Sequence, residues 1–365
     1  MNDSIKYYDA AATTPVDPRV LEKMLPYFSE IFGNASSNHV FGREAKKAIE
    51  EARSHVAEII NAEAKDIYFT SGSTESINLA LKGFLEANPE NGNHIITVKT
   101  EHKAVLNTCE YLETKGYEVT YLNVDENGLI NFDELEEAIS IQTALICVMY
   151  VNNEIGVIQD IARIGNIATE NDIVFFCDAT QAVGKVDVDI ERDQIDMLCF
   201  SGHKMNGPKG IGALYIKNGI KVNPIIHGGG QEMGLRGGTY NTPLIVGFGE
   251  ASRIAKEELT SNVLSLSNKR KEISKYYESN NIGIVNFKDV PTAPHILSIT
   301  LKNHEAEDYL LMHTKELVAS TGSACSSSIL LQSHVMQSLN FIETRKVIRI
   351  SIDPISRNGI KKYID

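Results

Sequence analysis

The sequence has no tryptophan, ten prolines and only five cysteines among its 365 residues. The cysteines form no C-x-x-C pair and no zinc-finger spacing, which argues against a disulfide scaffold. No run of 18 apolar residues occurs, and the stretch MNDSIKYYDA at the start lacks the regions of a signal peptide. No G-x-G-x-x-G follows an early strand pattern, which makes a Rossmann enzyme the weakest alternative. These absences favour a protein of the reducing cytoplasm with no membrane segment.

Basic residues are also scarce, because 35 Lys and Arg face 48 Asp and Glu for a formal net charge of −13. An acidic surface disfavours direct binding to nucleic acid or to an anionic membrane. It remains compatible with a basic protein partner.

The chain is longer than a single hydrophobic core usually grows, and 42% of its residues are hydrophobic. We therefore expect two domains. The large one should span residues 15–255, and a smaller α+β domain should combine residues 1–14 with residues 256–365.

Strand and helix patterns alternate through the first two thirds of the sequence. Helical periodicity is clear at residues 44–60, and a long polar helix is expected over residues 250–279. Seven short β-branched or aromatic runs read as strands: DIYFTSG, HIITVKT, EVTYLNV, TALICVMYV, IVFFCDA, DMLCFSG and IGALYIK. This alternation predicts an α/β fold with a mostly parallel seven-stranded sheet covered on both faces, in which the last two strands pair antiparallel. PHILSITL and VIRISID should be strands of the smaller domain, packed with the start of the chain.

Polar, reactive residues follow five of these strands, in the stretches SGSTES, TEH, VNNE, DATQ and SGHK. Ligands of open α/β sheets bind beyond the carboxyl ends of the strands. Five such endings on one sheet predict a single crevice.

The first ending, SGSTES, offers backbone N–H groups and hydroxyls that suit a phosphate. The ordinary alternative is a helix N-cap at Ser73 or Thr74, and N-caps are far commoner than phosphate sites.

Asp178 and Lys204 each follow a nearly continuous apolar run. A buried carboxylate needs a cationic partner, and a buried ammonium needs a partner or a covalent function. Asp178 could be an N-cap or an ion-pair partner, and most lysines simply extend to the surface. Together, however, the two residues match what pyridoxal 5′-phosphate (PLP) requires: an amine for the aldehyde and a carboxylate for the ring nitrogen.

Two further residues are candidates for chemistry at the crevice. His102 could be a structural histidine, or it could stack on an aromatic cofactor or transfer protons. Cys147, Cys177 and Cys199 lie in apolar strands and Cys109 in a helical pattern, whereas Cys325 lies in the small, polar stretch STGSACSSS. Nothing bulky surrounds Cys325, so its thiol should be exposed, either as a liability or as a nucleophile.

Nine stretches resemble the cysteine desulfurases of aminotransferase class V, and the resemblance spans residue 8 to about residue 352. They are DAAATTPVDPRV, FGNASSNHVFG, FTSGSTESINLALKG, TEHKAVLNTCEYL, VNNEIGVIQDI, DATQAVGK, FSGHKMNGPKGIGALY, HGGGQEMGLRGGT and STGSACSSS. The stretch around Cys325 is similar to the long-loop subgroup, which donates sulfur for iron–sulfur clusters, thiolated tRNA or modified DNA. The resemblance implies a PLP-dependent fold type I homodimer that uses L-cysteine and delivers sulfur to an acceptor protein.

Carried over by position, the resemblance implies a role for each of several residues. Lys204 should bind PLP covalently and move protons at the substrate Cα, and Cys325 should receive the sulfur as a persulfide. Asp178 should pair with the pyridine nitrogen of PLP, Gln181 should donate to its phenolic oxygen, and His102 should stack on its ring. The phosphate should be bound by Thr74, Ser201 and His203, together with Thr239 from a partner subunit. The substrate carboxylate should be bound by Asn153 and Arg349 and, more weakly, by Asn34.

The implied reaction yields L-alanine, and it requires thiolates at two sulfur atoms. A free thiol with a pKa of about 8.5 is only a few per cent ionised at neutral pH, so a base is needed, and His102 is the candidate. The sequence departs from the family in having Ala35 where proline is common, and in ending sooner than many long-loop members, in the region that serves them for docking.

Three other functions fit parts of the pattern. A different class V aminotransferase would have no use for the Cys325 thiol, whereas a selenocysteine lyase would share every feature. A scaffold that mainly relays persulfide to partners would suit the acidic surface. Alanine release with and without a thiol reductant would separate it from an enzyme, because a scaffold would stall after one turnover.

Overall fold

The computed structural model describes residues 6–321 and 333–355. The strands are β1 (Lys6–Tyr7), β2 (Ile67–Thr70), β3 (His94–Val98), β4 (Glu118–Leu122), β5 (Thr143–Cys147), β6 (Val174–Asp178), β7 (Met197–Ser201), β8 (Gly212–Ile216), β9 (Gly283–Val285), β10 (Ile296–Leu301), β11 (Leu317–Val318) and β12 (Val347–Ser351). The helices are α1 (Pro18–Met24), α2 (Pro26–Ser29), α3 (Val40–Glu58), α4 (Ser73–Asn78), α5 (Phe84–Ala87), α6 (Lys103–Glu113), α7 (Phe132–Ala138), α8 (Ile161–Glu170), α9 (Thr242–Glu257), α10 (Leu259–Ser279), α11 (Ala306–Met312) and α12 (His334–Ser338).

The predicted seven-stranded sheet is confirmed, with strand order β2-β8-β7-β6-β5-β3-β4. Strands β3 to β7 pair in parallel, whereas β8 pairs antiparallel with both β7 and β2. The antiparallel pairing of the last two strands was expected because the loop between them is too short for a crossover helix.

Helices cover both faces of this sheet, and alternate residues of each strand supply the two cores. In β6, Phe175 and Cys177 join the core formed with α3, α8 and α9, whereas Phe176 joins the core formed with α4, α5 and α6. This period of two explains why a strand buried on both faces reads as an unbroken apolar run.

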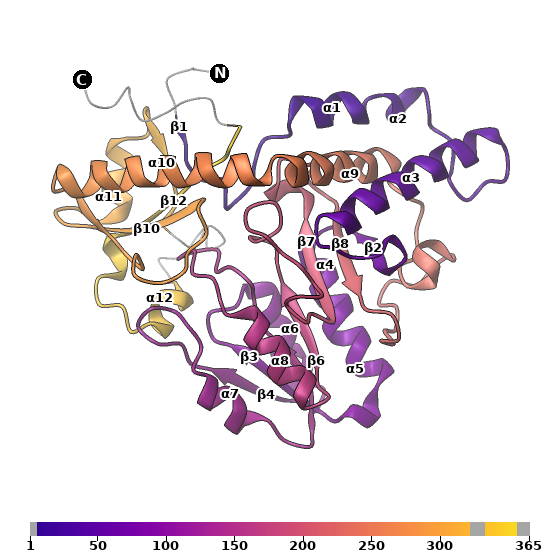
Figure 1. Cartoon of the computed structure of the whole chain (residues 1–365), viewed down its shortest axis with the longest axis horizontal. Helices are drawn as coiled ribbons and strands as arrows, with labels where there is room; N and C mark the ends of the chain where they lie inside the picture. Colours follow the sequence, from indigo (N-terminus) through magenta and orange to yellow (C-terminus); the bar gives the residue numbers. More distant parts are fainter. Residues whose placement is uncertain (1–5, 322–332, 356–365) are drawn as a thin grey trace.

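The remaining strands form two small sheets on the other side of the molecule (Figure 1). One is antiparallel with order β12-β10-β9, and the other pairs β1 with β11 in parallel. The start of the chain therefore lies against its C-terminal third, as the sequence predicted. The core of the two small sheets also includes Leu266, Ile273 and Tyr277 of α10.

Two expected helices differ from the structure. The long helix predicted over 250–279 belongs to α9 and α10, which meet at Glu258 and run almost in line across the molecule (Figure 1). The helical pattern after SGS is interrupted by a π-helical turn at Leu79–Gly83, between α4 and α5. No described helix is both long and apolar enough to cross a bilayer.

Candidate active site

A cavity of about 620 Å³ lies where the parallel strands of the large sheet end. Segments after β2, β3, β5, β6 and β7 contribute to its wall, and the small sheets close it with the chain start and part of β12. The lining includes these residues that the sequence singled out: Thr74, His102, Asn153, Asp178, Gln181, Ser201, His203, Lys204 and Arg349. The single crevice predicted from the strand endings is therefore present.

Lys204 ends a short 3-10 turn, Gly202–Lys204, directly after β7. Its Nζ donates to the carbonyl oxygens of Ala11 and Ala12, at 2.6 and 2.7 Å. The chain start thus supplies acceptors that allow a half-buried ammonium beside an apolar strand.

Asp178 is the last residue of β6 and is 4% exposed. Its Oδ1 accepts from the Thr180 amide at 2.9 Å and from the Cys199 thiol at 3.6 Å. No described residue donates to Oδ2 or forms an ion pair with this carboxylate. The ion-pair alternative therefore finds no support here, and Oδ2 can accept from a ligand in the cavity.

Gln181 lies one turn beyond Asp178 with its side-chain amide held at both ends. Its Nε2 donates to the Ala11 carbonyl at 2.9 Å, and its Oε1 lies 3.3 Å from Nε2 of the buried His295. Because a carbonyl only accepts, the NH₂ group of Gln181 must face Ala11, which fixes the orientation of the amide.

The helix after β2 begins at Ser73, and its N-cap is Gly72, which makes no side-chain capping bond. The alternative of an N-cap at Ser73 or Thr74 is therefore wrong. Gly72 has φ = 150°, a conformation that favours glycine. The Thr180 hydroxyl donates to Ser73 Oγ at 2.7 Å, while Thr74 lines the cavity beside the unpaired first-turn amides of the helix.

Two more predicted phosphate ligands lie at this end of the cavity. Ser201 Oγ donates to the Ile211 carbonyl at 3.3 Å, and His203 Nδ1 lies 3.1 Å from Thr13 Oγ1. Burial, together with the positive charges of Lys204 and Lys209, lowers the pKa of His203 to about 4. A phosphate would offset those positive charges.

His102 is the N-cap of α6, and its Nδ1 accepts from the Ala104 amide at 3.1 Å. Burial lowers the pKa of His102, although the nearby Asp178 carboxylate opposes the shift. His102 is therefore both a structural cap and a wall of the cavity.

Arg349 of β12 is 2% exposed and reaches the opposite wall of the cavity. Its guanidinium donates to the Asn153 carbonyl at 2.8 Å and to Asp9 Oδ1 at 2.7 Å. The predicted carboxylate ligands Asn153 and Arg349 thus touch each other.

Three predicted residues are not part of the described cavity. Asn34 and Thr239 are exposed and do not line it. Cys325 lies outside the described residues.

Three residues at the site were not predicted from the sequence: Glu101, which does not line the cavity, and Glu154 and His334, which do. Glu101 is fully buried behind His102; its Oε1 accepts from the Met149 amide, and burial raises its pKa well above the ordinary value. Glu154 and His334 line the cavity itself. Glu101 and Glu154 belong to the stretches TEH and VNNE, which were singled out in the sequence, so both acidic residues could have been predicted as part of the site.

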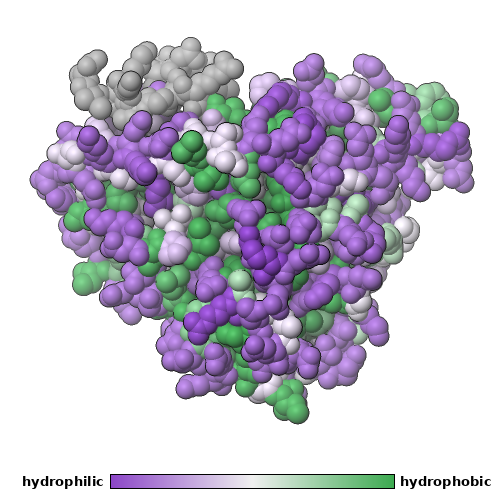
Figure 2. Space-filling model, viewed as in Figure 1, coloured by the Kyte–Doolittle hydropathy of each residue, from purple (hydrophilic) through white to green (hydrophobic). Residues whose placement is uncertain are grey.

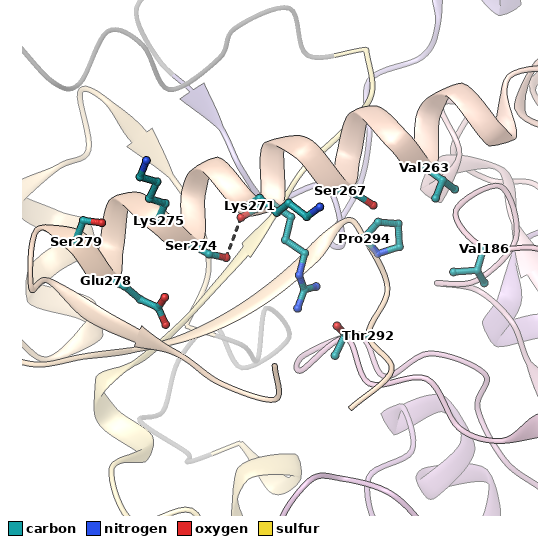
Figure 3. A pocket seen from close by; sticks show the side chains of 11 residues that line it. Val186, Val263, Ser267, Lys271, Ser274, Lys275, Glu278, Ser279, Thr292 and Pro294 are labelled. Atoms are coloured by element: carbon teal, nitrogen blue, oxygen red, sulfur yellow. Dashed lines mark hydrogen bonds between the residues drawn. The ribbon is translucent and has the colours of Figure 1, made fainter. Parts of the chain in front are cut away.

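A second hollow, of about 670 Å³, opens along α10 and shares no lining residue with the active-site cavity (Figure 3). Its basic and hydroxyl side chains, such as Lys271 and Ser274, project from one surface helix. Arg270 is not free for a ligand, because its guanidinium donates to the carbonyls of Ala293 and Ile296. The hollow has no convergent reactive set.

Comparison with known proteins identifies the family. Residues 6–358 match the aminotransferase class-V family. Cysteine desulfurase IscS of Neisseria meningitidis serogroup C is 53% identical over 336 residues, which cover 91% of this chain and 83% of that protein. The corresponding enzyme of Methylococcus capsulatus is 49% identical over the same shares.

Solved structures agree. A NifS-like protein superposes with a TM-score of 0.89 at 36% identity, covering 96% of this chain and 94% of the other. The structure of SspA in complex with cysteine superposes with a TM-score of 0.85 at 41% identity, covering 96% of this chain and 99% of the other. DndA from Streptomyces lividans superposes with a TM-score of 0.80 at 35% identity, covering 95% of this chain and 99% of the other.

The chain belongs to the cysteine desulfurases of aminotransferase class V.

The PLP-dependent chemistry of this family fits the donor set of the cavity. Hydroxyl and amide donors occur near Ser73 and Thr74, and Asp178 and Lys204 line the same cavity. No cluster of metal-ligating side chains occurs among the residues that the structure describes. The site thus offers a group for each charged end of PLP.

The lowered pKa of His203 predicts a pH effect on the stability of the desulfurase without PLP. In the unfolded chain His203 titrates near its ordinary pKa of about 6.5, whereas in the fold it stays neutral down to about pH 4. Between these values the unfolded chain binds one proton more, so the free energy of unfolding falls as the pH falls through this window. Urea unfolding of His203→Gln should show a shallower fall between pH 6.5 and 4 than the wild type, and the exposed His304→Gln should behave like the wild type. If the free energy of unfolding fell equally with pH in His203→Gln and in the wild type, the lowered pKa of His203 would be contradicted.

Proposed function

We propose that this desulfurase converts L-cysteine to L-alanine and transfers the sulfur to Cys325 as a persulfide, for delivery to an acceptor protein. The observation that carries the proposal is the convergence of Lys204, Asp178 and Arg349 on one cavity. An amine for the cofactor, a carboxylate for its ring nitrogen and a buried guanidinium for an α-carboxylate are together what an amino-acid enzyme of this class needs.

PLP, when bound, supplies the electron sink for the negative charge that develops when the substrate Cα loses its proton. Asp178 Oδ2 would keep the ring nitrogen protonated, and Gln181 and His102 would hold the ring. Thr74, Ser201 and His203 would bind the phosphate, and Thr239 of a second subunit would add a further contact.

Arg349 and Asn153 bind the carboxylate of L-cysteine, with Asn34 as a weaker candidate. Lys204, released from the Ala11 and Ala12 carbonyls, takes the Cα proton and returns it later. The Cys325 thiolate then attacks the substrate sulfur: the new S–S bond forms, the Cβ–Sγ bond breaks, and its electron pair stays on carbon, which is protonated to give L-alanine.

The higher identity to the IscS relatives than to DndA or SspA favours iron–sulfur cluster assembly among the three acceptor classes. The four described cysteines are free and buried, which supports the cytoplasmic location and leaves Cys325 as the proposed sulfur carrier. The division into a large domain of residues 15–255 and a small domain of residues 1–14 and 256–365 is likewise a proposal.

Alanine release tests the sulfur-transfer proposal. With L-cysteine and dithiothreitol, the wild type should release alanine over many turnovers, because the thiol clears the persulfide from Cys325. Cys325→Ser should bind PLP with an unchanged visible spectrum but lose at least about 100-fold in alanine release, as expected when a nucleophile is removed. Ser328→Ala is the matched control and should be normal. Normal release by Cys325→Ser would remove Cys325 from the mechanism, and a wild type that stops after one turnover with dithiothreitol present would favour the scaffold alternative.

A homodimer is proposed from an apolar surface formed by α1, α2 and the start of α3. Six large side chains there are well exposed: Leu21, Leu25, Phe28, Phe32, Val40 and Phe41. Phe32 and Phe41 stack with their ring centroids 5.9 Å apart, and a few hydrophobic residues are visible among the hydrophilic ones at this outer end of the molecule (Figure 2). Contiguous exposed apolar side chains of this kind mark protein interfaces, and a second copy would cover them.

Sedimentation velocity tests the dimer. The wild type should sediment as a dimer of the 40.3 kDa chain, and the double change Phe28→Glu with Phe32→Glu should give a monomer, because two charges would have to be desolvated at the contact. The monomer should also bind PLP more weakly, since Thr239 of the partner is lost. Ile141→Glu, at a 94% exposed position elsewhere, should remain dimeric. A dimer that survives the double change would place the interface on another surface.

A further inference from the structure

His334 is held rigidly at the wall of the active-site cavity. It is the first residue of α12, directly after the N-cap Ser333. Ser333 Oγ accepts from the Met336 amide at 3.2 Å and donates to the buried Glu154 carboxylate. The imidazole itself is half-buried and is fixed by a second contact.

That second contact determines which ring nitrogen carries the proton. His334 Nε2 lies 2.8 Å from the backbone carbonyl oxygen of Glu101. A carbonyl can only accept, so Nε2 must be the protonated nitrogen. Neutral His334 therefore keeps its basic lone pair on Nδ1, and no described residue donates to that atom.

His102 has the opposite arrangement. Its Nδ1 accepts from the Ala104 amide, so in the neutral ring Nδ1 is unprotonated and Nε2 carries the hydrogen. To take a proton, His102 would have to break its cap on α6. This geometry suits a ring that stacks and donates, and it argues against the role of base that the sequence suggested for His102.

His334 also separates two spaces. It lines the active-site cavity, and it lines an outer hollow of about 470 Å³ together with Lys99, Tyr121 and Gln337. His334 therefore contacts both the active-site cavity and the outer hollow. The charged and titratable groups around it are Glu101, whose carbonyl it contacts, His102, Lys103 and Glu154 in the cavity lining, and Lys99, Glu110 and Tyr121 in the lining of the hollow.

We propose that His334 is the proton acceptor for the thiol of the incoming L-cysteine. The inference rests on the proposed desulfurase function. In the step, the substrate Sγ–H bond breaks and an Nδ1–H bond forms, leaving a thiolate in the cavity and an imidazolium at His334. The Nδ1–H bond then breaks and its proton passes to water, while Nε2 keeps its hydrogen on the Glu101 carbonyl, so the histidine is restored in the same tautomer without an oxidant or reductant.

The pH profile of His334→Gln tests the step, because glutamine can still donate to the Glu101 carbonyl but cannot accept a proton. At pH 7 we expect kcat/KM for L-cysteine to fall about 100-fold, the usual size of a general-base effect. The deficit should shrink above pH 8.5, where L-cysteine ionises without help. Spectroscopic titration of the holoenzyme with L-alanine, which has no thiol, should give an affinity within twofold of the wild type. An unchanged kcat/KM profile, or an equal loss of L-alanine binding, would overturn the proposal.

Labelling of the PLP-free protein gives a readout independent of turnover. Diethyl pyrocarbonate attacks an unprotonated ring nitrogen, so at pH 7 peptide mass spectrometry should show His334 reacting at least ten times faster than His102, with exposed His304 as reference. Equal labelling rates for the two histidines, or faster labelling of His102, would contradict the tautomers assigned to His334 and His102. If the wild type fails to release alanine from L-cysteine, the proposed function fails, whereas this labelling result still judges the assignment of His334.

Discussion

The peptide groups of Ala11 and Ala12 are the point on which the site depends. The Ala11 carbonyl accepts from both Lys204 Nζ and Gln181 Nε2, and the Ala11 amide donates to Ser351 Oγ. A residue from the start of the chain thereby joins the ends of β6 and β7 to β12. Since Ala11 is 2% exposed, none of these bonds is replaced cheaply by water.

This connection explains why the cavity has two chemically different walls. The wall from the large sheet carries Asp178 and Lys204, whereas the wall from β12 carries Arg349, which is held by Asp9. The described acceptors of the Lys204 ammonium are backbone carbonyls, which carry no charge, rather than the Asp178 carboxylate. Asp178, in turn, keeps one oxygen free of described donors.

Much of this could be predicted from the sequence, because both the fold and the site follow local patterns. Unbroken apolar runs such as IVFFC identify strands buried on both faces, and the polar residue that follows each run identifies the edge where ligands bind. Other features depend on contacts between distant residues. The carbonyl partners of Lys204 are alanines, whose side chains carry no signal, and the cap at Gly72 depends on a φ angle. His334 stands in the unremarkable stretch SHVM, and its tautomer follows from a carbonyl 233 residues away.

Sodium borohydride reduction of the holoenzyme, followed by tryptic mass spectrometry, tests the central claim most directly. Reduction makes the bond between PLP and its lysine permanent, so the mass of the cofactor stays on one peptide. The account predicts that label on the peptide that contains Lys204. Label on Lys103 or Lys209, which line the same cavity, with Lys204 unmodified, would contradict it.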